Sequence, residues 1–371
     1  MTVVRHAGLA AALCALALGT GCAAVQANRR TPGTIANGTF TPGRAGSAQF
    51  GPNPALLCPT GGAFPILASD AAELARDAKR PVPLGDGRLC AVADALLGWT
   101  DPGTPPESVM SFLAWHYGLL AAPTRVLVTT LETEDPRILA QRLLDPVNAF
   151  GSTALAPRFG VVTSREKKGF TKTVVVLYDA LAELEPLARR VEGGQVPVRG
   201  RLAAGLGKPQ LSACDTAGSL KNVAAGNGPD FQADLACGAK PGMLLVEVRA
   251  DRDGEAVSVA RFPVMCGADL PASVKVPPAP PKGGEVVAGA DRAVFDLVNG
   301  ERSAAGVPPL EWDPGVAQVA KAASEATRDE SRSTSTSNTI NFDVIGQLRK
   351  ADVVSPLVLL NPAASRAPEE A

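Results

Sequence analysis

The hydrophobic positions between residues 51 and 178 change repeatedly between helical spacing and short β-branched runs. Such a mixture is typical of a small α+β domain, because apolar positions recur every three to four residues in a buried helix and in blocks or alternation in a strand. Helices are expected over Ala71–Lys79, Cys90–Trp99, Pro105–Leu120 and Asp135–Leu144. Strands are expected over Arg125–Thr130, Arg158–Thr163 and Thr173–Tyr178.

Residues 179–270 show a different pattern, in which short β-like runs recur between turns rich in Gly, Asp and Asn. The runs are Gln195–Leu202, Pro209–Ala213, Phe231–Leu235, Met243–Arg249 and Ala256–Val264. Residues 251–254 (DRDG) form a strong hairpin signal between the last two runs. Regularly spaced short strands of this kind predict an immunoglobulin-like β-sandwich.

Two segments lack a core pattern and are expected to connect modules. Residues 23–50 are rich in Asn, Thr, Gly and Ser, which predicts a flexible stalk. Residues 271–289 are rich in Pro, which favours a semi-rigid polyproline spacer. Helical spacing returns in residues 290–371, so the fold class expected is a multidomain α+β protein.

The first 22 residues have the layout of a secretory signal peptide. Arg5 precedes a continuous apolar run, Ala7 to Leu18, which is shorter than the roughly 20 residues that a membrane-spanning helix needs. The next residues, Leu18-Gly19-Thr20-Gly21-Cys22, resemble a bacterial lipobox, although Gly19 stands where Leu is preferred. We therefore expect export and a lipid on Cys22 that binds the protein to a membrane of the cell envelope, facing the periplasm or the outer surface. Cleavage near Ala24 without lipidation is the alternative.

The cysteines fit an exported chain. Of seven, Cys14 lies in the signal and Cys22 is the lipid site, which leaves five in an oxidising compartment where disulfides form. The preferred pairs are Cys58–Cys90 and Cys237–Cys266, which leaves Cys214 as a free thiol. A Cys214–Cys237 bond is a second possibility.

Charge and motifs argue against several classes of activity. The 36 basic and 37 acidic residues give a net charge of −1, so nucleic acid is not an expected partner. His116 is the one histidine of the exported part, and a histidine in a helix-like apolar run packs in a core or an interface more often than it catalyses. The sequence has no G-x-S-x-G nucleophile motif and no phosphate-binding loop after a strand. Glu132 and Glu134 fit a solvated turn. No catalytic, cofactor-binding or metal-binding residue is expected.

The C-terminal module resembles a known family. Val294, Leu297 and Val298 form an apolar helical stripe, a Gly-Val-Pro-Pro break follows, and a second helix begins after Trp312-Asp313, with Asp313 able to cap it. The motif residues are Asn299, Arg302, Gly306, Leu310, Trp312 and Asp313. Over residues 290–330 this pattern resembles the opening of a CAP domain, also called the SCP domain, of cysteine-rich secretory, antigen 5 and pathogenesis-related proteins. The resemblance implies the first half of an α-β-α sandwich, with Trp312 anchored beneath the turn.

The family's cleft contains two histidines and two acidic residues that can bind a metal, and this chain departs from that pattern. Ala323-Ser324-Glu325 stands in the comparable stretch, and no histidine follows His116. No site residues are therefore carried over, and residues 290–371 are interpreted as a partial module. We expect a noncatalytic role in binding or presentation, directed at an envelope, protein or glycan ligand. Metal-dependent or hydrolytic activity in the CAP-like cleft is one alternative, and a truncated or degenerate CAP protein with a structural role is another.

Overall fold

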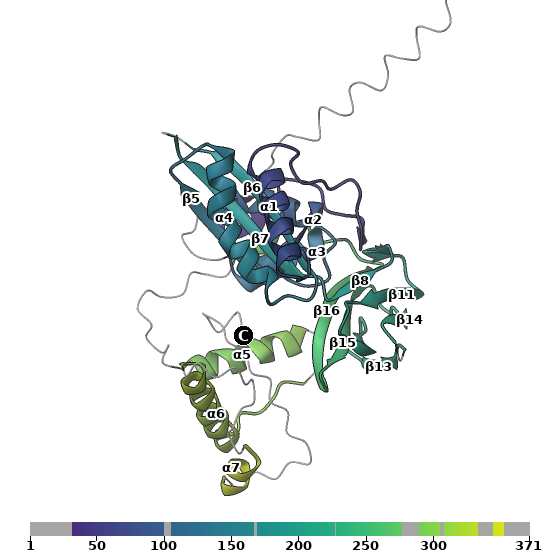
Figure 1. Cartoon of the computed structure of the whole chain (residues 1–371). Coiled ribbons are helices and arrows are strands. Elements are labelled where there is room, and N and C mark those ends of the chain that lie inside the picture. The colour runs from purple at the N-terminus through teal and green to yellow at the C-terminus, as the bar shows by residue number, and fades with distance from the viewer. Residues whose placement is uncertain are drawn as a thin grey trace, which may run out of the picture.

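The computed structural model describes residues 32–99, 105–166, 169–226, 228–276, 289–304, 308–332 and 344–351. These ranges contain several β-sheets and seven α-helices, so the chain is a multidomain α+β protein (Figure 1). The signal region and Cys22 lie outside the described residues.

The first domain contains a four-stranded sheet with helices on both faces. The strand order is β4-β6-β7-β5, with β4 parallel to β6 and the other pairs antiparallel. The strands are β4 (Leu84–Gly85), β5 (Arg125–Leu131), β6 (Pro157–Arg165) and β7 (Thr171–Asp179). The helices are α1 (Ala63–Asp77), α2 (Gly87–Leu96), α3 (Glu107–His116) and α4 (Pro136–Gly151). Figure 1 shows α1 and α4 lying along the sheet.

Side-chain alternation along the two central strands explains this layering, because successive residues of a strand point to opposite faces. Val175 and Leu177 of β7 pack with the cluster that contains α1 and α4. Val174 and Val176 pack with the cluster that contains α2 and α3. Because both faces are covered, consecutive residues in the middle of each central strand are apolar, at 159–162 in β6 and 174–177 in β7.

Two of the helices differ in length from the sequence-based expectation. α1 begins at Ala63 rather than at residue 71, and it accommodates Pro65 because this residue falls in the first turn, where no intrahelical N–H donor is needed. α4 continues past the internal Pro146 to Gly151. Its N-terminus is as expected, since the Asp135 side chain accepts a hydrogen bond from the Arg137 N–H at 2.8 Å.

The second domain is a β-sandwich of two sheets around one hydrophobic core. One sheet has the order β10-β16-β15-β12-β13 and the other β14-β11-β8. The strands are β8 (Ala182–Leu184), β10 (Arg190–Val191), β11 (Gln195–Leu202), β12 (Gly207–Cys214), β13 (Leu220–Ala224), β14 (Asp230–Ala236), β15 (Gly242–Arg252) and β16 (Glu255–Cys266). Val198, Leu235, Val246 and Phe262 meet between the sheets and are at most 3% exposed.

The flexible stalk expected over residues 23–50 is wrong for residues 32–50, which are part of the folded body. β1 (Thr34–Ala36) pairs with β2 (Thr39–Thr41), and β2 pairs in turn with β17 (Val274–Lys275). β3 (Gln49–Phe50) pairs with β9 (Leu187–Ala188). Phe40 and Phe50 are fully buried, beside Trp99 and Phe262 at centroid distances of 6.2 and 4.9 Å. These two aromatic side chains bury enough apolar area to order an otherwise polar segment.

The Pro-rich linker expected over 271–289 is corrected in the same way at its start. β17 pairs with β2, and the Val276 N–H donates to the Gly38 carbonyl at 2.7 Å. The folded body therefore extends to residue 276. Residues 277–288 lie outside the described part of the chain.

Two disulfides cross-link the body, and they are the preferred pairs from the sequence. Cys58–Cys90 has a Cα–Cα distance of 5.2 Å and fastens the segment before α1 to α2. Cys237–Cys266, at 5.8 Å, joins the end of β14 in one sheet to the end of β16 in the other. Cys214 is a free thiol.

The C-terminal part of the described chain is helical. It contains α5 (Ala290–Ala304), α6 (Pro314–Arg332) and α7 (Val344–Lys350). Val319, Ala323 and Leu348 are each 7% exposed, in the part of the chain where α6 contacts α7. Among the described residues, no helix is both long enough and apolar enough to cross a membrane.

Candidate functional site

The residues singled out in the C-terminal module hold the turn between α5 and α6. The side-chain amide of Asn299 on α5 forms two hydrogen bonds with the backbone of Leu310. Its Oδ1 accepts from the Leu310 N–H at 2.7 Å, and its Nδ2 donates to the Leu310 carbonyl at 3.1 Å. One turn further along α5, Arg302 Nε donates to the Pro308 carbonyl at 2.9 Å. Backbone groups of the turn are thus satisfied by side chains of the preceding helix.

An aromatic contact also joins α5 to the segment that leads into α6. The rings of Phe295 and Trp312 meet edge to face with centroids 5.1 Å apart. The Arg292 guanidinium lies 5.1 Å from each ring centroid and contributes a cation–π interaction to both. Trp312 therefore anchors the turn against α5.

Asp313 begins α6 as an N-cap. Its Oδ1 accepts from the backbone N–H groups of Gly315 and Val316 at 2.8 and 3.0 Å, and Pro314 occupies the first helical position. Gly306 lies outside the described residues. The side chains of Asn299, Arg302, Trp312 and Asp313 are therefore engaged in hydrogen bonds and ring contacts within the module, whereas Leu310 is held through its backbone.

Four large apolar side chains of this module are exposed to solvent. Leu297, Val298, Leu310 and Val316 are 42–46% exposed. We call these four residues the module face. Within the described ranges, no group of three or more His, Cys, Asp or Glu side chains is placed to hold a metal ion. The four side chains of the module face are aliphatic and carry no polar or titratable group.

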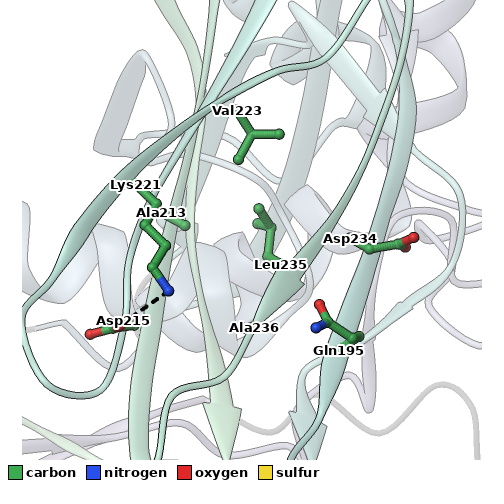
Figure 2. Close-up of a pocket in the computed structure, with 8 residues that line it drawn as sticks. All are labelled: Gln195, Ala213, Asp215, Lys221, Val223, Asp234, Leu235 and Ala236. Atoms are coloured by element: carbon green, nitrogen blue, oxygen red, sulfur yellow. Dashed lines mark ion pairs between the residues drawn. The ribbon is translucent and has the colours of Figure 1, made fainter.

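A cavity of about 160 Å³ opens in the sandwich between β13 and β14, the strands that end the two sheets (Figure 2). Val223 and Leu235 provide its apolar lining, with Asp215 and Lys221 on one side and Asp234 with Gln195 on the other. Asp215 and Lys221 form an ion pair at 3.8 Å. No sequence pattern marks this cavity, since residues 220–224 show no clear alternation of a strand.

The charged side chains on one side of the cavity, Asp215 and Lys221, already have hydrogen-bond or ion-pair partners within the sandwich. Asp215 Oδ1 accepts from the backbone N–H groups of Ser219 and Ala217 at 2.9 and 3.0 Å. The Ser219 hydrogen bond is the largest cause that lowers the pKa of Asp215 below its ordinary value, and Ala217 and Lys221 add to it. Asp215 is therefore a turn-forming carboxylate, and the space beside it fits an apolar side chain better than a reacting group.

His116 lies at the junction of the two domains. It is 8% exposed, and its Nε2 is 3.0 Å from the Arg44 carbonyl oxygen. Burial is the main cause that lowers the pKa of His116, and the charge of Arg189 lowers it further. Arg189 Nη1 donates to the carbonyls of Ser47 and His116 at 2.7 and 2.8 Å. This network connects α3, the segment before β3 and the residue after β9.

Residues 295–370 match the family model of the cysteine-rich secretory protein family, CAP. The match spans the turn described above and continues past the described residues. No curated protein matches the chain. A CAP-family domain is therefore present at the C-terminus.

Proposed function

We propose that this protein is exported, anchored by a lipid on Cys22 to a membrane of the cell envelope, and carries its CAP-family domain as a noncatalytic binding or presentation module. The observation on which the proposal rests is the CAP-family match at residues 295–370, in a chain that begins with a signal-like and lipobox-like segment. The two disulfides support the exported location, because such bonds persist in oxidising compartments.

The body between anchor and module is proposed to act as a platform. The Trp115 indole donates to the Arg261 carbonyl at 2.9 Å, and the Arg261 N–H donates to the Leu120 carbonyl at 2.7 Å. Together with the Arg189 network, these contacts connect the α+β domain to β16 of the sandwich. Two domains joined by backbone hydrogen bonds and buried side chains form a firmer support than two domains on a flexible linker.

We further propose that the sandwich is immunoglobulin-like. In chain order, β8, β11 and β14 take the places of strands A, B and E, and β12, β13, β15 and β16 take those of C, C′, F and G. The disulfide departs from the antibody arrangement, because it follows β14 and ends β16 instead of joining the second and sixth strands. An immunoglobulin-like sandwich between two other modules is well suited to spacing or binding.

The binding role is assigned to the module face, formed by Leu297, Val298, Leu310 and Val316. The nearby motif side chains maintain the turn, which leaves the exposed apolar residues for a partner. Burial of such side chains contributes about 25 cal/mol per Å² of apolar area removed from water. A protein or glycan of the envelope is the proposed ligand.

The anchor is tested by cell fractionation of Cys22→Ala beside wild type. We expect wild-type protein in the membrane fraction, extracted by detergent, and Cys22→Ala released into the soluble exported fraction. Cys14→Ala is the matched control, since it removes a thiol from the same segment but leaves the proposed lipid site, and it should stay with the membrane. Equal distribution of Cys22→Ala and wild type would remove the lipid from the proposal.

The noncatalytic role is tested by elemental analysis of the purified protein. We expect no stoichiometric metal. Stoichiometric metal that is lost on Glu325→Ala and kept on Glu311→Ala would replace this proposal with a metal-dependent activity in the CAP-like cleft. Limited proteolysis tests the degenerate alternative: if residues 290–371 are degraded as fast as an unfolded peptide, the role of that part is structural at most.

A further inference from the structure

The outer face of the five-stranded sheet contains an apolar patch that the proposed function does not use. Cross-strand register aligns Leu220 with Cys214, Cys214 with Leu245, and Leu245 with Pro263, in one row across four strands. Met243 and Met265 pair in the neighbouring row. We call these six residues the sheet patch.

Alternation shows that the sheet patch faces away from the sandwich core. The residues next to Cys214, Leu245 and Pro263 along their strands are Ala213, Leu244 and Val264, which are buried in the core at 5% exposure or less. Side chains one position along a strand point to the other face. Leu220 is 68% exposed and Met243 48% exposed, so the patch contacts solvent.

Polar rows flank the patch on the side away from the methionines. Register places Ser212, Glu247 and Arg261 in the first row, and Gln210 and Arg249 in the next. The face thus combines an apolar area with both an acid and two bases. A surface that combines these groups can pack on a second copy of itself across a two-fold axis, where residues away from the axis meet different residues of the same patch and a residue at the axis meets its own copy.

We propose that the sheet patch is the contact surface of a homodimer, with Cys214 of the two copies close enough to be cross-linked. The odd number of cysteines supports a second copy of the chain as the partner of this surface. Five cysteines remain after residue 22, two disulfides use four, and the leftover thiol lies within the apolar patch. An odd thiol in an exported protein is suited to intermolecular pairing.

The size of the surface sets the strength of the dimer. Four strands at about 4.8 Å spacing and seven residues at about 3.4 Å rise give a footprint of roughly 450 Å². A stable interface of standard size buries about 800 Å² per partner. The noncovalent dimer is therefore weak and concentration-dependent, and a disulfide between the two thiols would make it permanent.

The test uses the full mature chain with Cys22→Ser, so that Cys214 is the one cysteine outside the disulfides. Oxidised glutathione is added as the oxidant. One glutathione disulfide is reduced to two glutathione thiols, which take up the two protons of the Cys214 thiols. The two Cys214 sulfurs are oxidised to one disulfide. We expect a dimer on non-reducing gels, reversed by reductant and absent in Cys214→Ser.

A second variant distinguishes cross-linking through a specific interface from cross-linking by random collision of exposed thiols. Met243→Lys places a charge in the sheet patch and keeps the thiol, and Leu74→Lys makes the same kind of change on α1 at 39% exposure. We expect the initial rate of dimer formation to fall at least tenfold in Met243→Lys and to stay unchanged in Leu74→Lys. Reaction of Cys214 with a maleimide checks that the thiol remains equally accessible.

Two results would overturn the proposal. One is an equal cross-linking rate in Met243→Lys and wild type. The other is sedimentation of the reduced protein as a monomer at every concentration up to about 1 mM, a concentration at which even a weak specific interface associates measurably. Wild-type sedimentation that shifts toward a dimer with concentration, and no such shift in Met243→Lys, would support it.

Discussion

Replacement of Arg189 by Met tests the junction between the α+β domain and the sandwich. The Arg189 side chain is 4% exposed, and its Nη1 donates to the carbonyls of Ser47 and His116. The guanidinium also lies 5.8 Å from the Phe50 ring centroid. Arg189→Met keeps the apolar stem but removes the cation and both hydrogen bonds.

The size of the effect follows from opposing contributions. A hydrogen bond to a charged group contributes about 1.5–3 kcal/mol, so two bonds give roughly 3–6 kcal/mol. Burial of the cation offsets part of this, as shown by the lowered pKa of Arg189, whose cause is desolvation. We therefore expect Arg189→Met to lower the free energy of unfolding by about 2–4 kcal/mol, within the range of mutations that break a buried polar network.

Urea titration followed by tryptophan fluorescence measures this change, with Trp115 at the junction as one of the reporters. Arg190→Met is the matched control, because its side chain is 44% exposed and pairs with Glu192 and Asp269 at 3.3 Å on the surface. Exposed ion pairs contribute at most about 1 kcal/mol. If Arg189→Met and Arg190→Met destabilise the protein equally, the Arg189 network does not hold the junction.

Three further predictions concern other parts of the chain. Burial lowers the pKa of His116 below its ordinary value of 6.5, so on acidification His116 gains a proton in the unfolded chain before it does so in the folded protein. The free energy of unfolding should therefore fall as the pH drops below 6.5. Urea titrations at pH 7 and pH 5 should show a smaller loss of this free energy in His116→Gln than in wild type. Alanine at both positions of the Cys58–Cys90 bond, whose cysteines are 32 residues apart, should cost about 4 kcal/mol by loop-closure entropy; a loss below about 1 kcal/mol in a urea titration would contradict that entropic estimate. Asn299→Ala removes the acceptor of the Leu310 N–H, so hydrogen exchange at Leu310 should speed up about fivefold, as for a loss of about 1 kcal/mol; unchanged exchange would show that the side-chain amide does not hold the turn.

Strands and helix starts with strong local patterns could be predicted from the sequence. The expected strand at 125–130 is β5 (Arg125–Leu131), because its β-branched residues fit a half-buried pleated surface. The start of α4 was predicted because Asp135 and Pro136 are an N-cap and a first-turn proline. Asp313 and Pro314 signal the start of α6 in the same way.

The features that depend on distant partners could not be predicted. Phe40 and Phe50 order residues 32–50 through contacts with Trp99 and Phe262, which local composition does not reveal. The cavity between β13 and β14 exists only once two sheets have packed, so no stretch of sequence marks it. The cation–π contacts of Arg292 depend on a turn that brings Trp312 back beside α5.

Mass spectrometry of the mature N-terminus tests the central proposal most directly. We expect the first residue of the purified membrane-associated protein to be Cys22 and to carry diacylglycerol. A mature chain that begins near Ala24 without lipid, or a chain that retains Met1, would contradict the lipid anchor.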